Sequence, residues 1–274
     1  MKLATVHAPG GTVAVRIEDG HLVELDAPDV GGLLRDPDWQ TRAQQAGPRS
    51  DRADTLRYAP PVLAPEKIIC VGLNYRQHIT EMGREIPQYP ALFAKFSRSL
   101  IGAYDDIVLP PESASVDWEA ELGIIIGATA RHASVDQAGS AIAGYTVVND
   151  ITMRDWQYRT PEWLQGKTFE ASTPVGPWLV TRDEAGDPTF ELSCLLDGEV
   201  MQSANTGDLV FSPAELVSYI SGFITLMPGD LIATGTPGGV GHARTPQRYL
   251  QPGSLLETTV AGVGRLANRI IDAP

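Results

Sequence analysis

The sequence predicts an α+β fold that is rich in β-strands. Three observations support this prediction. Apolar runs of strand length recur along the chain, the helical segments between them are few and short, and the pairs Asp19-Gly20 and Asp197-Gly198 are typical of two-residue hairpin turns. A doubly wound parallel sheet would need a helix after nearly every strand, so a β-rich α+β domain matches the pattern better.

The first 61 residues differ in character from the rest of the chain. Residues 2–25 alternate in polarity and contain Glu18-Asp19-Gly20-His21, which predicts a hairpin between two short strands. Residues 28–60 are polar and rich in Asp, Arg and Pro, which indicates a small helix and a linker. We therefore expect a small N-terminal module at residues 1–61 and a main domain at residues 62–274.

The main domain begins with a short apolar run at residues 67–71. Asn74, with Gln77 three positions later, resembles a helix N-cap, and Gly83 would end that helix. Residues 212–215, Ser-Pro-Ala-Glu, predict another helix start. Further strands are expected at residues 92–96, 106–109, 117–126, 144–150, 175–181, 190–196 and 199–204, with two or three more within residues 231–271.

Composition and charge exclude several classes of function. The chain has 274 residues and a net charge of −13, so it would repel a phosphate backbone and we expect no nucleic-acid partner. No apolar stretch approaches the ~20 residues of a membrane-spanning helix, and the N-terminus shows no signal-peptide pattern. Cys70 and Cys194 both lie in apolar segments. We therefore expect buried, reduced thiols in a cytoplasmic protein with no membrane partner.

Two glutamates in a strand-like segment give the clearest chemical signal. Glu119 and Glu121 are two residues apart, so in a strand both side chains project from one face, and Asp117 would start on the same side. A solvated acidic face on an edge strand is the competing explanation. However, residues 122–126 are all apolar or Gly, which indicates a strand that enters the interior. Two like charges there need a cation or a shared proton.

Asp150 is a third carboxylate, and it closes the apolar run of residues 144–150. It could instead cap a helix within residues 151–163. Together with Glu119 and Glu121, and without clustered His or Cys, it completes a set of oxygen ligands. Such a set suits Mg²⁺ or Mn²⁺, is compatible with Ca²⁺, and argues against zinc.

His78 and Glu81 lie three residues apart on the short helix predicted after residue 74. They share a helix face, so the carboxylate could orient the imidazole and raise its basicity. A surface pair is the competing explanation.

Two lysines and a threonine stand out by their surroundings. Lysine is scarce in this chain, yet Lys95 and Lys167 lie among apolar and glycine residues. A structural lysine with a buried stem would also explain them. Thr236 belongs to the glycine-rich residues 234–241, whose amides and hydroxyl could hold a substrate carboxylate. A plain multiple turn is the alternative.

Taken in chain order, these segments resemble the fumarylacetoacetate hydrolase family from about residue 67 to the C-terminus. The matching segments are 71–81, 92–95, 117–122, 149–157, 166–169, 173–178 and 234–239. Residues 1–60 resemble the variable N-terminal module of bacterial members. The resemblance implies a mixed β-sandwich roll, usually assembled as a homodimer.

The resemblance also implies which side chains form the site. Glu119, Glu121 and Asp150 would hold the metal, and His78 with Glu81 would activate water.

Five further positions match functional residues of the family. Lys167 and Gln157 correspond to groups that steady developing negative charge. Arg154, Thr236 and Lys95 match positions around the substrate.

The implied activity is divalent-metal-dependent hydrolysis of a carbon–carbon bond in a 2-oxo acid or 1,3-diketone, an acylpyruvate-like substrate, in aromatic-compound catabolism. The alternative is a decarboxylase, isomerase or hydratase that acts through the same enolate on a 2-oxo diacid, such as oxaloacetate or 2-hydroxyhepta-2,4-diene-1,7-dioate. Acylpyruvase-like members carry an Arg where this chain has Leu73, which argues against a narrow acylpyruvase specificity. A non-catalytic protein on the same fold would be expected to lose the proton-handling residues, and this chain retains them.

Overall fold

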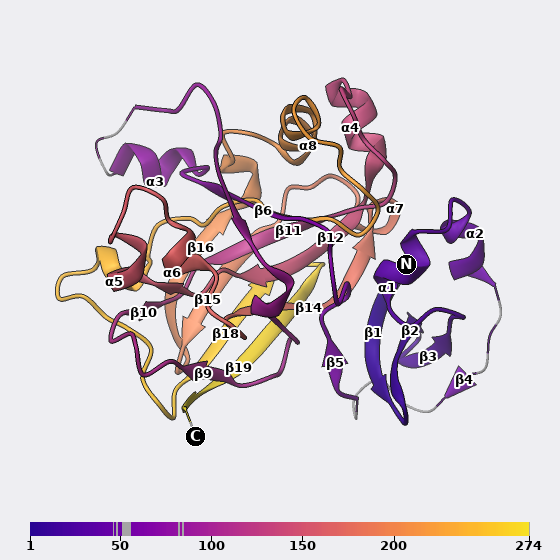
Figure 1. Ribbon diagram of the computed structural model, residues 1–274, viewed down its shortest axis with the longest axis horizontal. Coiled ribbons are helices and arrows are strands. Elements are labelled where there is room, and N and C mark those ends of the chain that lie inside the picture. The colour runs from indigo at the N-terminus through magenta and orange to yellow at the C-terminus, as the bar shows by residue number, and fades with distance from the viewer. Residues whose placement is uncertain (46, 48, 51–55, 82, 84, 274) are drawn as a thin grey trace.

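The computed structural model describes residues 1–45, 47, 49–50, 56–81, 83 and 85–273 (Figure 1). For Arg49, Ser50, His78 and Glu81 it describes the backbone alone. A large mixed sheet forms its centre. Its strands are β1 (Lys2–Ala8), β2 (Gly11–Glu18), β3 (His21–Glu24), β4 (Arg49–Ser50), β5 (Tyr58–Ala59), β6 (Ile68–Gly72), β7 (Ala91–Lys95), β8 (Leu100–Ile101), β11 (Ala120–Ile126), β12 (Ile142–Asn149), β14 (Thr173–Thr181) and β17 (Leu231–Ala233). They follow the order β4-β3-β2-β1-β14-β12-β11-β17-β6-β7, with β5 beside β1 and β8 beside β14.

A second sheet packs against the middle of the first. It has the order β16-β15-β18-β19-β9, from β9 (Ile107–Leu109), β15 (Glu191–Leu196), β16 (Glu199–Asn205), β18 (Leu255–Val260) and β19 (Gly264–Asp272). Leu122 and Val147 of the central sheet share one buried cluster with Leu192 and Leu256 of the second sheet. A small separate pair joins β10 (Val116–Asp117) to β13 (Thr152–Met153). The prediction of a β-rich α+β fold is confirmed.

The helices are short and lie around the sheets. They are α1 (Val30–Leu34), α2 (Trp39–Gln44), α3 (Arg76–Glu81), α4 (Val135–Ala141), α5 (Arg154–Gln157), α6 (Leu164–Lys167), α7 (Arg182–Ala185), α8 (Pro213–Ser221) and the 3-10 turns η2 (Ser97–Ser99), η3 (Thr206–Asp208) and η4 (Gly241–Ala243). Figure 1 shows α4 and α8 side by side at one edge of the molecule. The predicted start of α8 is confirmed, because Ser212 and Glu215 form a reciprocal capping box. In the part of the chain that the structure describes, no helix has the length and apolar character needed to cross a membrane.

The described part of residues 1–61 contains three more strands, namely β3, β4 and β5, and one more helix than the sequence pattern predicts. β1, β2 and β3 form an antiparallel meander, with α1 and α2 beside it. Asp19 and Gly20 turn the chain between β2 and β3 with φ values of 51° and 76°, as a two-residue hairpin requires. β1 also pairs with β14, where Leu3 lies opposite Leu179. The division at residues 61 and 62 stays a prediction.

The segment before α3 is attached to the glycine-rich turn of residues 234–241. The expectation that Asn74 caps α3 is wrong, because its carboxamide is used elsewhere. Its oxygen accepts the N–H of Phe211 over 2.8 Å, and its nitrogen donates to the carbonyl of Thr234 over 2.8 Å. At α3 itself, the Gln77 N–H donates to Asp208 over 3.0 Å. Two segments that the sequence singled out for chemistry therefore lie beside each other.

Candidate metal centre

Three buried carboxylates meet where β11 begins and β12 ends. The two strands are antiparallel and pair Ala120 with Asn149, so Glu119, just before β11, lies beside Asp150, just after β12. Ligand oxygens of Glu119, Glu121 and Asp150 all lie within 4.8 Å of one another. All three residues are buried, so a solvated acidic face does not describe them.

Three cationic side chains contact these carboxylates. Lys167 Nζ lies 2.6 Å from Glu119 Oε2 and 2.9 Å from Asp150 Oδ2. Lys95 Nζ lies 2.6 Å from Asp150 Oδ1, and Arg154 Nη1 lies 2.8 Å from Glu119 Oε1. Burial lowers the pKa of Lys167, but the charges of Asp150 and Glu119 outweigh that effect and hold its pKa above the ordinary value. Lys167 is therefore a buried, charged member of the site.

Glu121 and Asp150 differ in how their charge is compensated. Burial raises the pKa of Asp150, and Lys167 and Lys95 outweigh that effect, so its pKa lies below the ordinary value and it is ionised. Glu121 accepts the Gly235 N–H over 2.8 Å, and among the described residues no cationic group forms an ion pair with it. Burial raises the pKa of Glu121 well above its ordinary value, and the charges of Asp150 and Glu119 raise it further. Of the three carboxylates, Glu121 is therefore the one without a cationic partner among the described residues.

The donor set fits a divalent cation. Counting Asp117, four buried carboxylates face the three buried cations Lys95, Arg154 and Lys167, so the group carries one excess negative charge when all are ionised. A divalent cation beside Glu121 would make the net charge of this group positive, which would favour the binding of an anionic substrate. Because the ligand atoms are all carboxylate oxygens, Mg²⁺, Mn²⁺ or Ca²⁺ suits them better than zinc.

Asp117 anchors the site and does not face water. Its Oδ2 accepts Arg154 Nε over 2.8 Å, and its two oxygens accept the N–H groups of Gly241 and His242 over 2.7 and 3.0 Å. The sequence placed Asp117 on the same side as Glu119 but could not show these partners, because they lie 37 to 125 residues away. Asp117 thus connects Arg154 to the loop that carries His242.

A cavity of about 310 Å³ adjoins the carboxylates. Five residues that the sequence singled out line it, namely Glu119, Arg154, Gln157, Lys167 and Thr236.

Gln157 and Thr236 are held in fixed orientations in that lining. The Gln157 side-chain oxygen accepts Arg154 Nη1 over 2.9 Å, and its amide N–H groups donate to no partner in the described part of the chain. The Thr236 hydroxyl donates to the Ala120 carbonyl over 3.0 Å and accepts Gln202 Nε2 over 2.7 Å. Sequence reasoning missed Gln202, since nothing in its strand pattern marks it as different from any buried polar residue.

His78 and Glu81 both lie on α3, and their side chains lie outside the described residues. The helix starts three residues after Leu73, which lines the cavity. Leu73 has a φ of 55°, a left-handed conformation that is rare for a residue with a branched side chain. Such strain is often found next to binding sites.

The wall of the cavity also contains aromatic residues that the sequence analysis did not select. Phe93 and Trp163 pack edge to face with ring centroids 5.6 Å apart, and Tyr158 lies over His242 at 5.3 Å. Burial and the charge of Arg154 lower the pKa of His242, so its ring is neutral at pH 7. In the sequence, His242 directly follows the glycine-rich residues 234–241, and this position was the signal that could have indicated its place in the cavity wall.

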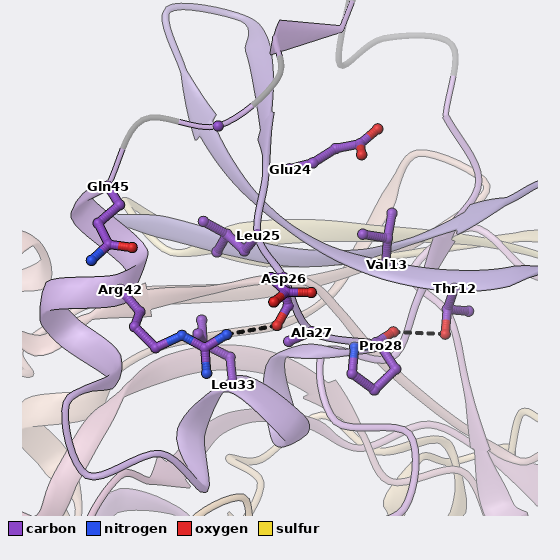
Figure 2. Close-up of a pocket in the computed structure, with 11 residues that line it drawn as sticks. Thr12, Val13, Glu24, Leu25, Asp26, Ala27, Pro28, Leu33, Arg42 and Gln45 are labelled. Carbon is purple, nitrogen blue, oxygen red and sulfur yellow. Dashed lines mark hydrogen bonds between the residues drawn. The ribbon is translucent and has the colours of Figure 1, made fainter.

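A second hollow, of about 640 Å³, lies over β2, β3 and α2 (Figure 2). Its polar groups serve the local fold. Arg42 donates to the Asp26 carbonyl over 2.7 Å and pairs with Asp36 over 2.9 Å, and the Thr12 hydroxyl donates to the Pro28 carbonyl over 2.8 Å. The carboxylate cavity is therefore the candidate active site.

Known proteins resemble this chain along most of its length. It is 45% identical over 250 residues to 2,4-didehydro-3-deoxy-L-rhamnonate hydrolase of Sphingomonas sp. (strain SKA58), covering 86% of this chain and 88% of that protein. It is 43% identical over 218 residues to oxaloacetate tautomerase Fahd2a, mitochondrial, of Rattus norvegicus, covering 79% of this chain and 70% of that protein.

Solved structures share the whole fold. Fumarylacetoacetate hydrolase from psychrophilic Exiguobacterium antarcticum matches with a TM-score of 0.89 and 31% identity over 100% of both chains. Maleylpyruvate hydrolase from Sphingobium sp. SYK-6, solved with manganese(II) and pyruvate, matches with a TM-score of 0.82 and 27% identity over 100% of both chains. The family model described as fumarylacetoacetate (FAA) hydrolase C-terminal matches residues 67–271. The chain therefore belongs to the fumarylacetoacetate hydrolase family of enzymes.

Proposed function

We propose that the chain is a divalent-metal-dependent hydrolase that cleaves a carbon–carbon bond in an acylpyruvate-like 2,4-dioxo acid. The observation that carries this proposal is the buried group of Glu119, Glu121 and Asp150 beside a cavity lined by Lys167 and Arg154. The similarity to 2,4-didehydro-3-deoxy-L-rhamnonate hydrolase supports it, because that name describes hydrolysis of an acid with oxo groups at C2 and C4.

The carboxylates Glu119, Glu121 and Asp150 would hold Mg²⁺ or Mn²⁺. When bound, the cation would supply positive charge for the chelating oxygens of the 2-oxo acid. Arg154 lines the cavity and keeps its charge, so it would attract and orient the anionic end of the substrate.

The proton-handling residues would act at the far carbonyl. We assign His78, oriented by Glu81, to take a proton from water, whose oxygen adds to the C4 carbonyl carbon. Lys167 and the amide N–H groups of Gln157 would donate to the resulting oxyanion. The C3–C4 bond then breaks, its electron pair enters the enolate of pyruvate, and the proton on His78 completes the methyl group. One water is consumed, and pyruvate and a second carboxylic acid are released.

Thr236 and Lys95 have supporting roles in this proposal. The Thr236 hydroxyl lines the cavity, so it can contact the substrate. Lys95 contacts Asp150 and does not line the cavity, so its role is to keep that carboxylate ionised.

Product analysis tests the hydrolase proposal. Chelator-treated protein should be inactive on a 2,4-dioxo acid, and adding Mg²⁺ or Mn²⁺ should release pyruvate and the second acid in equal amounts. Failure to release pyruvate with either metal would overturn the proposal.

A second candidate is enolisation or decarboxylation of oxaloacetate. The 43% identity to an oxaloacetate tautomerase favours it, and neither reaction needs an attacking water. This candidate would be established if the protein equilibrates the keto and enol forms of oxaloacetate, or releases CO₂ from it, and does not cleave dioxo acids. The cytoplasmic location and the role in aromatic-compound catabolism stay predictions.

A further inference from the structure

His242 is held in place at the wall of the candidate active site by a rigid loop. Its backbone N–H donates to Asp117 over 3.0 Å, and the neighbouring Gly241 N–H donates to the same carboxylate over 2.7 Å. A Cβ at position 241 would lie 1.8 Å from the Arg248 carbonyl oxygen and 2.8 Å from Asp117 Oδ1, so the loop approaches its neighbours as closely as only glycine allows. Because Asp117 also binds Arg154, the loop is fixed relative to the cation-rich part of the cavity.

The His242 ring is oriented from its outer side. Nδ1 lies 2.8 Å from the Tyr249 hydroxyl and 3.3 Å from Gln247 Nε2, and the Tyr158 ring lies over it at 5.3 Å. Among the described residues, Nε2 has no hydrogen-bond partner, and His242 is one of the residues that line the cavity. In either tautomer, Nε2 can bond a hydroxyl group, since a hydroxyl both donates and accepts.

The cavity changes in character from its inner end to its mouth. Arg154 and Lys167 are buried and already paired with carboxylates, whereas His242 is half-buried and Tyr158 is 59% exposed. The described residues that line the rest of the wall are uncharged, and Leu73 is one of them. Among the described residues, a second carboxylate at the far end of a substrate would therefore find no unpaired cation there, but an uncharged hydroxyl would find His242.

We propose that His242 is a specificity-determining residue that binds a hydroxyl group on the tail of the substrate, so that the chain prefers a 2,4-dioxo acid with a hydroxylated tail over a diacid. This inference rests on the hydrolysis proposed above and adds the substrate class. The contact lies beyond the bond that breaks, so it acts through binding and orientation of the tail.

A matched pair of substrates tests the proposal. 2,4-Didehydro-3-deoxy-L-rhamnonate has a hydroxyl at C5, and 2,4-dioxohexanoate differs from it only by the absence of that hydroxyl. With Mn²⁺ present, wild-type protein should cleave the hydroxylated acid with a kcat/KM roughly 5–10-fold higher, the usual effect of one hydrogen bond to an uncharged group. Fumarylpyruvate, a diacid, should be cleaved less well than either.

Two variants separate recognition from folding. His242→Leu should bring the ratio of the two kcat/KM values close to one, mainly through KM, whereas His242→Gln keeps a hydrogen-bonding amide and should retain part of the preference. Mn²⁺ titration of each variant checks that the carboxylate site is intact.

The outcomes distinguish this proposal from the hydrolase proposal. If wild-type protein cleaves both acids equally well, or if His242→Leu keeps the wild-type ratio, the role of His242 is overturned while hydrolysis stands. If wild-type protein cleaves neither acid with Mg²⁺ or Mn²⁺, hydrolysis and the specificity that rests on it are overturned together.

Discussion

Lys167 Nζ lies 2.6 Å from Glu119 Oε2, and both side chains line the same cavity. In the proposed mechanism, this contact gives Lys167 two functions. It neutralises a buried carboxylate, and it places a fixed positive charge where a substrate oxygen would become negative. Such preorganised charge is worth most in a site that excludes water.

Replacing Lys167 should therefore affect turnover strongly. We expect Lys167→Met to lower kcat by about 10²–10³-fold, as the loss of one oxyanion donor does in other enzymes. The measurement is steady-state kinetics at saturating Mn²⁺. Lys2→Met is the matched control, because Lys2 lies over the Trp178 ring at 5.1 Å and does not line the cavity. Wild-type turnover in Lys167→Met would contradict the assignment.

Glu121 should make the stability of the metal-free protein depend on pH. Burial raises its pKa in the folded state above the ordinary 4.5, with Asp150 and Glu119 adding to the shift. The neutral carboxyl thus stabilises the fold at low pH, and this contribution is lost as pH rises through the folded pKa. In chelator, the Tm of Glu121→Gln should therefore rise relative to wild type as the pH increases above the ordinary carboxyl pKa of 4.5, by roughly 2–4 °C for each kcal/mol.

Thermal unfolding at several pH values checks this prediction. A Tm difference between Glu121→Gln and wild type that is constant with pH would show that Glu121 does not titrate in this way. With Mn²⁺ added, wild type should become the more stable of the two, because a charged carboxylate binds the ion more strongly than the neutral amide of Gln.

The pair on α3 should act in the chemical step. His78→Ala should lower kcat for hydrolysis by about 10²–10⁴-fold, the usual loss for a general base, while KM changes little. Thr80→Ala on the same helix is the control, since the one partner of its hydroxyl among the described residues is the Arg76 carbonyl. If His78→Ala hydrolysed dioxo acids like wild type, water activation would lie elsewhere and the oxaloacetate candidate would gain support.

The homodimer remains a prediction, and the surface beside β7 favours it. Among the described strands, β7 is the last of the central sheet, and an unpaired edge is a template for association. Phe96, Phe223 and Ile224 lie around it and are 58%, 58% and 40% exposed. We expect light scattering to give twice the mass of one chain, and Phe223→Glu to shift the protein toward monomer. A wild-type mass of 29.5 kDa would contradict the dimer.

The sequence predicted those parts of the site that depend on local geometry. Glu119 and Glu121 follow from the period of a strand, and Asp150 follows from its position at the end of an apolar run. Their meeting depends on the register between β11 and β12, which places Ala120 opposite Asn149. Register is set by long-range packing, so the sequence indicated the ligands without showing how they come together.

Other parts of the site had no local signal. Asp117 binds the His242 N–H across 125 residues of sequence, and Gln202 reaches Thr236 from the second sheet. The prediction that Asn74 caps α3 was wrong for the same reason, because the side chain of Asn74 bonds the distant Phe211 and Thr234 instead. Contacts between distant segments decide which of several chemically suitable polar residues enters a site.

The central claim is that Glu119, Glu121 and Asp150 form one divalent-metal site, and calorimetric titration tests it most directly. Titrating Mn²⁺ into chelator-treated wild-type protein should give about one ion per chain, as three mutually close carboxylates imply. Glu121→Ala should abolish that binding and the activity while the protein keeps its circular-dichroism spectrum. Wild-type protein that binds neither Mn²⁺ nor Mg²⁺, or a Glu121→Ala variant that binds Mn²⁺ as wild type does, would contradict the account.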